Sequence, residues 1–167
     1  MGDPFVICGT GHRPPKLGGY GDKARADLID FARRTLMVTL EDHPHRDLKV
    51  ISGMALGWDI ALAQASVILG IPFIAAIPFV GQEKAWPQES QDFYNSVLAL
   101  AEKKEIVCSG GYAPEKMLER NRWMVDNSSL VLALWDGSHG GTGHCVNYAK
   151  QQGKQIRQLW QFWREEH

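Results

Sequence analysis

Short apolar runs alternate with stretches of helical periodicity about six times along this chain, and this alternation restricts the fold more than any other feature. The apolar runs lie at residues 4–10, 48–52, 72–79, 105–109, 128–135 and 154–160. The helical patterns occupy residues 22–40, 57–70, 92–104, 113–128 and 141–154. Such alternation is typical of a parallel sheet covered by helices. The sequence therefore predicts an α/β, Rossmann-like, doubly wound fold, with a mainly parallel sheet of about six strands and helices on both faces.

Composition limits the classes of partner. The 167 residues fit one domain, 1–167, and the net charge of -1, from 18 basic and 19 acidic side chains, is unlike that of a protein that grips duplex DNA. Cys8, Cys108 and Cys145 lack CxxC spacing, so we expect reduced thiols in a cytoplasmic protein. We expect no signal peptide, because the segment MGDPFVICGTG (1–11) has neither a basic region nor a long apolar stretch. We expect no membrane span, because the longest apolar run is short and interrupted by proline.

Three of the expected strand-to-helix loops are rich in glycine. They read CGTGHRPP, SGMALGWD and WDGSHGGTG, at residues 8–15, 52–59 and 135–143. In doubly wound sheets, ligands bind beyond the carboxyl ends of the strands, where such loops meet. The three loops therefore predict one shared ligand crevice.

The loop at 135–143 favours an anion. Gly140, Gly141 and Gly143 surround Thr142 where a helix is expected to begin. Glycine lets backbone N–H groups approach a ligand, and a helix N-terminus carries unpaired donors and partial positive charge. We expect a phosphate over these four residues, the alternative being a tight turn in which Thr142 is only a cap.

The other two loops supply further candidates. In the second loop we expect Ser52, Gly53, Met54, Gly57 and Asp59 to contact the ligand. Asp59 either accepts hydrogen bonds from a ribose hydroxyl or complements the helix dipole.

In the first loop the candidates are Gly9, Thr10, Gly11, His12 and Arg13. This loop lacks the third glycine of the dinucleotide fingerprint. Arg13 is a candidate bidentate partner for phosphate, and the alternative is a solvated basic loop. We expect no metal and no other cofactor, since His139, His144 and Cys145 match no zinc-binding pattern.

Three segments in this order resemble the SLOG superfamily. ISGMALGWDIALAQASVILGIP (51–72) resembles a segment of DNA-processing protein A, and MLERNRWMVDNSSLVLALWDGSHGGTG (117–143) resembles the lonely guy phosphoribohydrolases. TGHRPPKLGGYG (10–21) is most similar to the small single-domain YpsA-like branch. The resemblance covers nearly the whole chain and implies a Rossmann-like sheet with a nucleotide or nucleotide-derived ligand at these loops.

The resemblance also raises a question about catalysis. It aligns the lonely guy arginine with Arg120, and it aligns the catalytic glutamate of that family with Cys145. A carboxylate stabilises the oxocarbenium-like centre of glycosidic cleavage, whereas a thiol of ordinary pKa is mostly neutral. The catalytic residues are thus unknown. Arg120, Glu119 and Asp136 are candidates, and Asp59 is a further acid that could substitute by position.

Three functions remain open. The first is a sensor or sink that binds a nucleotide or nucleotide-derived molecule, with Arg13, Arg120 and Asp136 beside the glycine cradle. The second is an enzyme that hydrolyses or transfers at the glycosidic bond of a nucleotide. The third is a single-stranded DNA-binding module, which is less favoured because the net charge is near neutral and no clear aromatic-basic stripe is present. We also expect a homo-oligomer, and we expect the aromatic segment WQFWREEH (160–167) to seal the sheet edge or to form a subunit contact.

Overall fold

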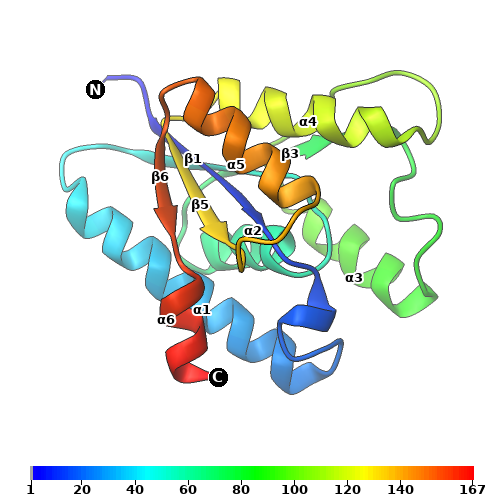
Figure 1. The fold of residues 1–167 in the computed structure, drawn as a ribbon, viewed down its shortest axis with the longest axis horizontal. Coiled ribbons are helices and arrows are strands. Elements are labelled where there is room, and N and C mark those ends of the chain that lie inside the picture. The colour runs from blue at the N-terminus through cyan, green and yellow to red at the C-terminus, as the bar shows by residue number, and fades with distance from the viewer. Residues whose placement is uncertain (1) are drawn as a thin grey trace.

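The computed structural model describes residues 2–167 and contains one six-stranded sheet (Figure 1). Its strands are β1 (Phe5–Gly11), β2 (Leu48–Ser52), β3 (Phe73–Ile77), β4 (Lys103–Ile106), β5 (Leu130–Leu134) and β6 (Gln155–Gln158). All neighbouring strands are parallel, in the order β4-β3-β2-β1-β5-β6. The predicted α/β, doubly wound class is confirmed.

Helices cover both faces of the sheet. They are α1 (Asp22–Asp42), α2 (Trp58–Ile68), α3 (Gln88–Leu98), α4 (Pro114–Asp126), α5 (Gly141–Gln151) and α6 (Trp160–Glu166), with a 3-10 turn η1 at Pro14–Lys16. Figure 1 shows α4 beside α5 on one side of the sheet and α1 beside α6 on the other. Two hydrophobic clusters follow this division, since Ile7 belongs to one cluster and its neighbour Cys8 to the other. Alternate residues of a strand point to opposite faces, so the buried strands are apolar on both.

The order of the strands places the ligand crevice. From β1 the chain builds outward through β2 and β3 to β4, then returns to add β5 on the other side of β1. The topology therefore reverses between β1 and β5. In doubly wound sheets the crevice outside the carboxyl ends of the strands at this reversal is where ligands bind. The glycine-rich segments at 8–15 and 135–143 lie at these two positions, although the first begins within β1 and the second ends within α5.

The boundaries of α3 and β4 differ from the prediction. The helix expected at 92–104 spans Gln88–Leu98, and the strand expected at 105–109 spans Lys103–Ile106. Residues 99–104 favour a helix by composition, but Lys103 and Lys104 instead pair with Ile74 and Ala75 of β3. Pairing in the sheet outweighs local helix propensity here, as tertiary context often does.

The strand expected at 154–160 ends at Gln158. Residues 160–166 form the helix α6, which follows the edge strand β6 and packs on α1 through Trp163. Trp163 is 4% exposed and lies edge-on to Phe31 of α1, with the ring centroids 5.3 Å apart. Among the helices of residues 2–167, none combines the length and apolar character needed to cross a bilayer.

Candidate functional site: a pocket at the switch point

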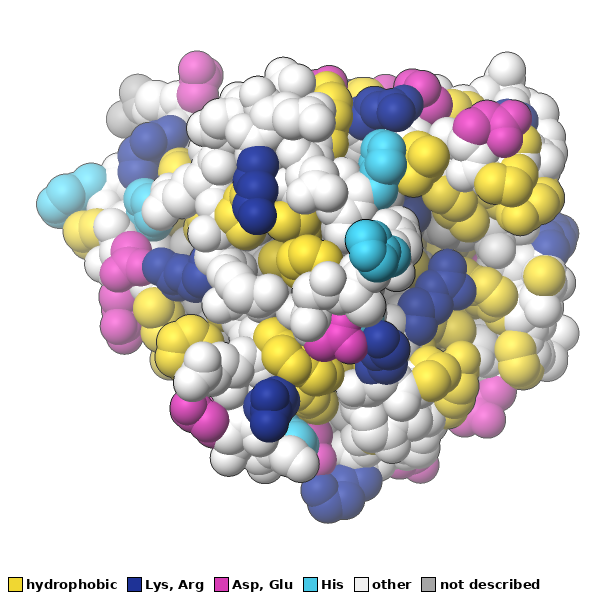
Figure 2. All heavy atoms as spheres, viewed as in Figure 1, with side chains coloured by type: hydrophobic (Ala, Val, Ile, Leu, Met, Phe, Trp, Pro, Cys, Tyr) yellow, Lys and Arg dark blue, Asp and Glu magenta, His cyan; other side chains and the backbone are white. Residues whose placement is uncertain are grey.

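A pocket of about 500 Å³ opens at the carboxyl ends of β1 and β5. The predicted site residues that line it are Thr10, His12, Arg13, Asp59, Arg120, Gly140, Gly141, Thr142 and Gly143. Figure 2 shows Lys, Arg and His side chains gathered around a recess on this face of the molecule, near the start of α5. The fold thus brings candidates from three loops and from α4 into one cavity.

The start of α5 forms an open wall of this pocket. The first hydrogen bond of the helix runs from the N–H of His144 to the carbonyl of Gly140, so the preceding amides have no acceptor within the helix. Gly140 has φ of 149°, and a Cβ on Gly141 would meet nothing within 4 Å. Thr142 donates its hydroxyl to the carbonyl of Gly11 over 3.1 Å, which ties this wall to the end of β1. This geometry exposes backbone donors to a ligand.

Gly9 and Gly11 occupy a different place from the one predicted. Neither lines the pocket, and both face α2. A Cβ on Gly9 would collide with Leu62, and a Cβ on Gly11 would lie 2.7 Å from both Trp58 and the carbonyl oxygen of Leu134. These two glycines are required by close packing of α2 on β1.

The loop between β2 and α2 is largely occupied with its own hydrogen bonds. Ser52 is 2% exposed; its hydroxyl donates to the carbonyl of Asp59 over 2.7 Å and accepts from the N–H of Met54 over 3.1 Å. Met54 is buried with φ of 61°, and Gly57, with φ of 96°, abuts the backbone of His12. Of the candidates predicted in this loop, only Asp59 reaches the pocket, and Ser52, Met54 and Gly57 shape the loop behind it.

Arg120 lines the pocket but uses its guanidinium to hold the loop in place. It is 4% exposed, and Nη1 donates to the carbonyl of Gly53 over 2.6 Å while Nε donates to Asn121 over 3.0 Å. Burial lowers the pKa of this guanidinium, and the nearby Asp59 carboxylate opposes the shift. A Cβ on Gly53 would lie 2.7 Å from Nη1, so Gly53 admits Arg120. Gly53 itself does not line the pocket.

Asp59 is the acidic group of the pocket. It is 8% exposed, and among residues 2–167 it is the one acidic side chain that lines the cavity. Burial raises its pKa to about 6, against the opposing charges of Arg120 and Arg13 and a hydrogen bond from the backbone of Ala55. The pocket floor therefore holds a carboxyl group that titrates near neutral pH.

Glu119 and Asp136, both predicted as weak catalytic candidates, lie outside the lining. Glu119 is on the exposed side of α4, paired with Arg122 over 3.0 Å. Asp136 accepts from the N–H of Ser138 and from Lys16 Nζ, both over 2.9 Å, and these contacts hold the pKa of its carboxyl well below the usual range. Asp136 orders the loop before α5.

His12 connects the first loop to the loop before α5. Its Nε2 accepts from the N–H of Asp136 over 2.9 Å, and its ring lies edge-on to Trp160, with centroids 5.3 Å apart. Burial lowers the pKa of His12, although the nearby Asp136 carboxylate opposes this shift. The lowered pKa favours the neutral imidazole at pH 7. The ring acts as an acceptor that fixes the two loops together.

Cys145 lies beneath the pocket and does not line it. The thiol is 1% exposed, and burial raises its pKa to about 11 in spite of a hydrogen bond with Thr10. It is a neutral thiol at pH 7, so α5 contributes no charged side chain at this position.

Several lining residues were not predicted as site residues. They are Pro15, Lys16, Ala55, Met117, Asn121, Trp135, Ser138 and His139. Met117 and Asn121 lie three residues before and one residue after Arg120 on α4, at i and i+4, so helical spacing could have identified them. Lys16, beside the predicted Arg13, could have been found from the basic character of its loop.

The chain is similar in sequence to a family of known proteins. A model of the YspA SLOG family matches residues 7–162. The SPbeta prophage-derived protein YoqJ of Bacillus subtilis (strain 168) is 35% identical over 119 residues, which cover 62% of this chain and 70% of YoqJ. A UPF0398 protein of Bacillus thuringiensis (strain Al Hakam) is 27% identical over 158 residues, covering 89% of this chain and 84% of the relative.

Solved structures share the fold. DNA processing protein A from Streptococcus pneumoniae matches with a TM-score of 0.62 at 19% identity, over 93% of this chain and 50% of that one. DNA processing protein A from Helicobacter pylori, solved in a study of its single-stranded DNA binding mode, matches with a TM-score of 0.63 at 19% identity, over 93% of this chain and 65% of that one. This chain thus spans half to two thirds of their length. The family match covers nearly all of residues 2–167, and the chain belongs to the YspA SLOG family.

Proposed function

We propose that the protein binds a nucleotide or nucleotide-derived small molecule in the switch-point pocket, as a sensor or sink. The observation that carries this proposal is the start of α5, where the backbone donors of residues 141–143 face an open cavity. A phosphate at a helix N-terminus accepts several N–H groups and meets the positive end of the helix dipole.

Cationic side chains support the same assignment. Arg13 and Lys16 line the pocket beside the α5 wall, and Arg13 forms no salt bridge among residues 2–167. Arg13 is thus available for a bidentate contact with phosphate. Arg120 acts from the floor, where its hydrogen bond to Gly53 holds the loop that carries Asp59. In this arrangement the sugar lies toward Asp59, which can accept hydrogen bonds from ribose hydroxyls.

Mass spectrometry of small molecules released by denaturing the purified protein tests the proposal, together with a thermal-shift screen of nucleotides. We expect an intact phosphorylated nucleoside derivative, which at about 100 times its Kd raises the melting temperature by roughly 5–10 °C. No retained compound and no stabilisation by any nucleotide in the screen would contradict the proposal.

A second candidate, hydrolysis of the N-glycosidic bond of a nucleotide, is favoured by Asp59. Its carboxyl group is buried in the pocket and has a raised pKa near 6, as general acids and bases often do. In this reaction water attacks C1′ as the C1′–N bond breaks, Asp59 takes the proton from the water, and the base leaves with a proton from solvent.

Chromatography of nucleoside 5′-monophosphates incubated with the protein separates the two candidates. Hydrolysis predicts free base and ribose 5-phosphate, abolished in Asp59→Asn and retained in Cys145→Ser, since that thiol is outside the pocket. Binding of an intact nucleotide without product leaves the sensor or sink as the function.

A further inference from the structure

A second cavity of about 530 Å³ lies beside the switch-point pocket, between the start of α1 and α6. We call it the α1–α6 cavity. Lys16 lines both cavities, and Trp160 of the second cavity lies edge-on to His12 of the first. The two cavities therefore meet at Lys16, at the rim of the proposed phosphate site.

Cationic side chains outnumber carboxylates in the lining of the α1–α6 cavity. Its lining includes Lys16, Lys23 and Arg164, against one carboxylate, that of Asp27. Asp27 is already paired with Lys23 over 2.7 Å. Lys16 Nζ contacts Asp136 over 2.9 Å and Ser138 over 3.3 Å, and an ammonium group has a third proton to donate. Arg164 forms no salt bridge among residues 2–167, so its guanidinium can pair with an anionic ligand.

The same cavity has aromatic walls. Trp160 and Trp163 both line the cavity, and of the two Trp160 is half-buried and Trp163 is buried. An indole ring can stack on any nucleobase, because every base has a π-face. Cations and an aromatic face together match a nucleotide better than a free inorganic anion.

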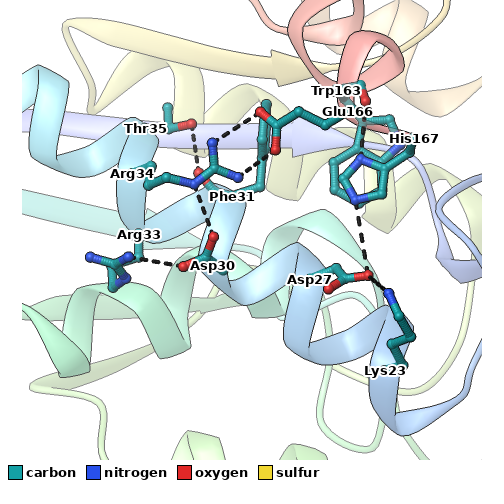
Figure 3. A network of polar contacts seen from close by, with 10 residues as sticks. All are labelled: Lys23, Asp27, Asp30, Phe31, Arg33, Arg34, Thr35, Trp163, Glu166 and His167. Carbon is teal, nitrogen blue, oxygen red and sulfur yellow. Dashed lines mark hydrogen bonds and ion pairs between the residues drawn. The ribbon is translucent and has the colours of Figure 1, made fainter.

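Contacts between α1 and α6 build this cavity in advance of any ligand (Figure 3). Arg34 forms a bidentate pair with Glu166, with distances of 2.6 and 2.9 Å, and Figure 3 shows this pair linking the two helices. Trp163 packs edge-on to Phe31, and the ring of His167 stacks on Trp163 with centroids 3.7 Å apart. A cavity whose walls are fixed loses little conformational entropy on binding.

We propose that the ligand is a dinucleotide that spans both cavities, with its second nucleotide unit in the α1–α6 cavity and its linking phosphate beside Lys16. This inference rests on the proposed function, because it places the first phosphate at the start of α5. It narrows the ligand from any nucleotide derivative to one with two nucleoside units.

Calorimetric titration tests the inference with the four ribonucleoside 5′-monophosphates and the homodinucleotides pApA, pGpG, pCpC and pUpU. We expect one dinucleotide to bind at least about 10-fold more tightly than its mononucleotide. Arg164→Glu, on an exposed part of α6, is expected to remove that advantage and to leave mononucleotide binding unchanged. Arg122→Glu, on the exposed side of α4, is the matched control and should leave both affinities unchanged.

Other outcomes would overturn either the second subsite alone or the proposed function with it. Equal affinity for mononucleotide and dinucleotide, or an equal loss of both in Arg164→Glu, would overturn the second subsite while the proposed function stands. Failure of every nucleotide to bind would overturn both. A dT8 strand that binds more tightly than every dinucleotide, and less tightly in Arg164→Glu, would replace the dinucleotide by single-stranded DNA.

Discussion

Asp59 couples the charge of the pocket floor to the stability of the fold. Its pKa is raised from 3.8 to about 6, so the folded protein binds this proton more tightly than the unfolded chain. The stability that protonation provides is complete below about pH 4 and is lost as the pH rises through about 6. We expect Asp59→Asn, which resembles the protonated form, to be about 2–3 kcal/mol more stable than the natural protein at pH 8.

Urea unfolding at a series of pH values measures this effect as the difference between the two proteins, so that other titrating groups cancel. The difference should vanish near pH 4. A difference that is the same at pH 4 and pH 8 would mean that Asp59 does not titrate in this range.

Substitution by alanine is expected to affect different properties at two glycines, stability at Gly11 and nucleotide binding at Gly141. Gly11→Ala should lower the free energy of unfolding by about 1–3 kcal/mol, because its Cβ would overlap Trp58 and the Leu134 carbonyl. Gly141→Ala should leave stability within about 0.5 kcal/mol, since its Cβ enters open space, and should instead weaken nucleotide binding. Chemical denaturation and calorimetry on both variants check this, and equal stability losses would contradict it.

These glycines also mark the limit of what single residues could reveal. The sequence predicted that all three loops are glycine-rich for a ligand, which remains the proposal for Gly140 to Gly143. Gly9 and Gly11 look the same in sequence but face Leu62 and Trp58, and only the packing of α2 on β1 shows this. In the same way, Arg120 was predicted beside the ligand. Its hydrogen bond to Gly53, which lies 67 residues earlier in the sequence, is seen only in the structure.

Among the elements, α6 depends on one buried side chain. Trp163 is 4% exposed against α1, whereas its neighbour Phe162 is 58% exposed. We expect Trp163→Ala to destabilise the protein by about 3 kcal/mol and to release α6 from α1. Phe162→Ala is the matched control, expected to change stability by no more than about 0.5 kcal/mol. Hydrogen exchange of residues 160–166 with urea unfolding measures both, and equal effects would argue against the packing of α6.

The central strands β2 and β5 were predicted close to their bounds, and the edge strand β6 lies within the run expected at 154–160, but the edge strand β4 begins two residues before the run expected at 105–109. The expected runs at 48–52 and 128–135 match β2 and β5, because a central parallel strand must be apolar on both faces. The edge strand β4 reads KKEI, with two exposed lysines, and carries no such signal. Charged residues are usual on edge strands, where they oppose aggregation.

For the whole molecule, the alternation of strands and helices was enough to predict the doubly wound class. It did not fix the strand order, which depends on the return of the chain from β4 to β5 across the sheet. That return forms the switch point, and with it the pocket that joins Arg13, Asp59 and the start of α5. The α1–α6 cavity was not predicted, because the segment 160–167 was not expected to fold back as a helix.

We propose that this pocket holds a nucleotide by its phosphate. The most direct test is calorimetric titration of the natural protein and Arg13→Ala with a nucleoside 5′-monophosphate and with the same nucleoside lacking phosphate. We predict that removing the phosphate or the arginine each weakens binding by about 10- to 100-fold, and that removing both adds little more, because the two groups pair. Equal affinity for nucleoside and monophosphate, or an equal loss of both in Arg13→Ala, would contradict the account.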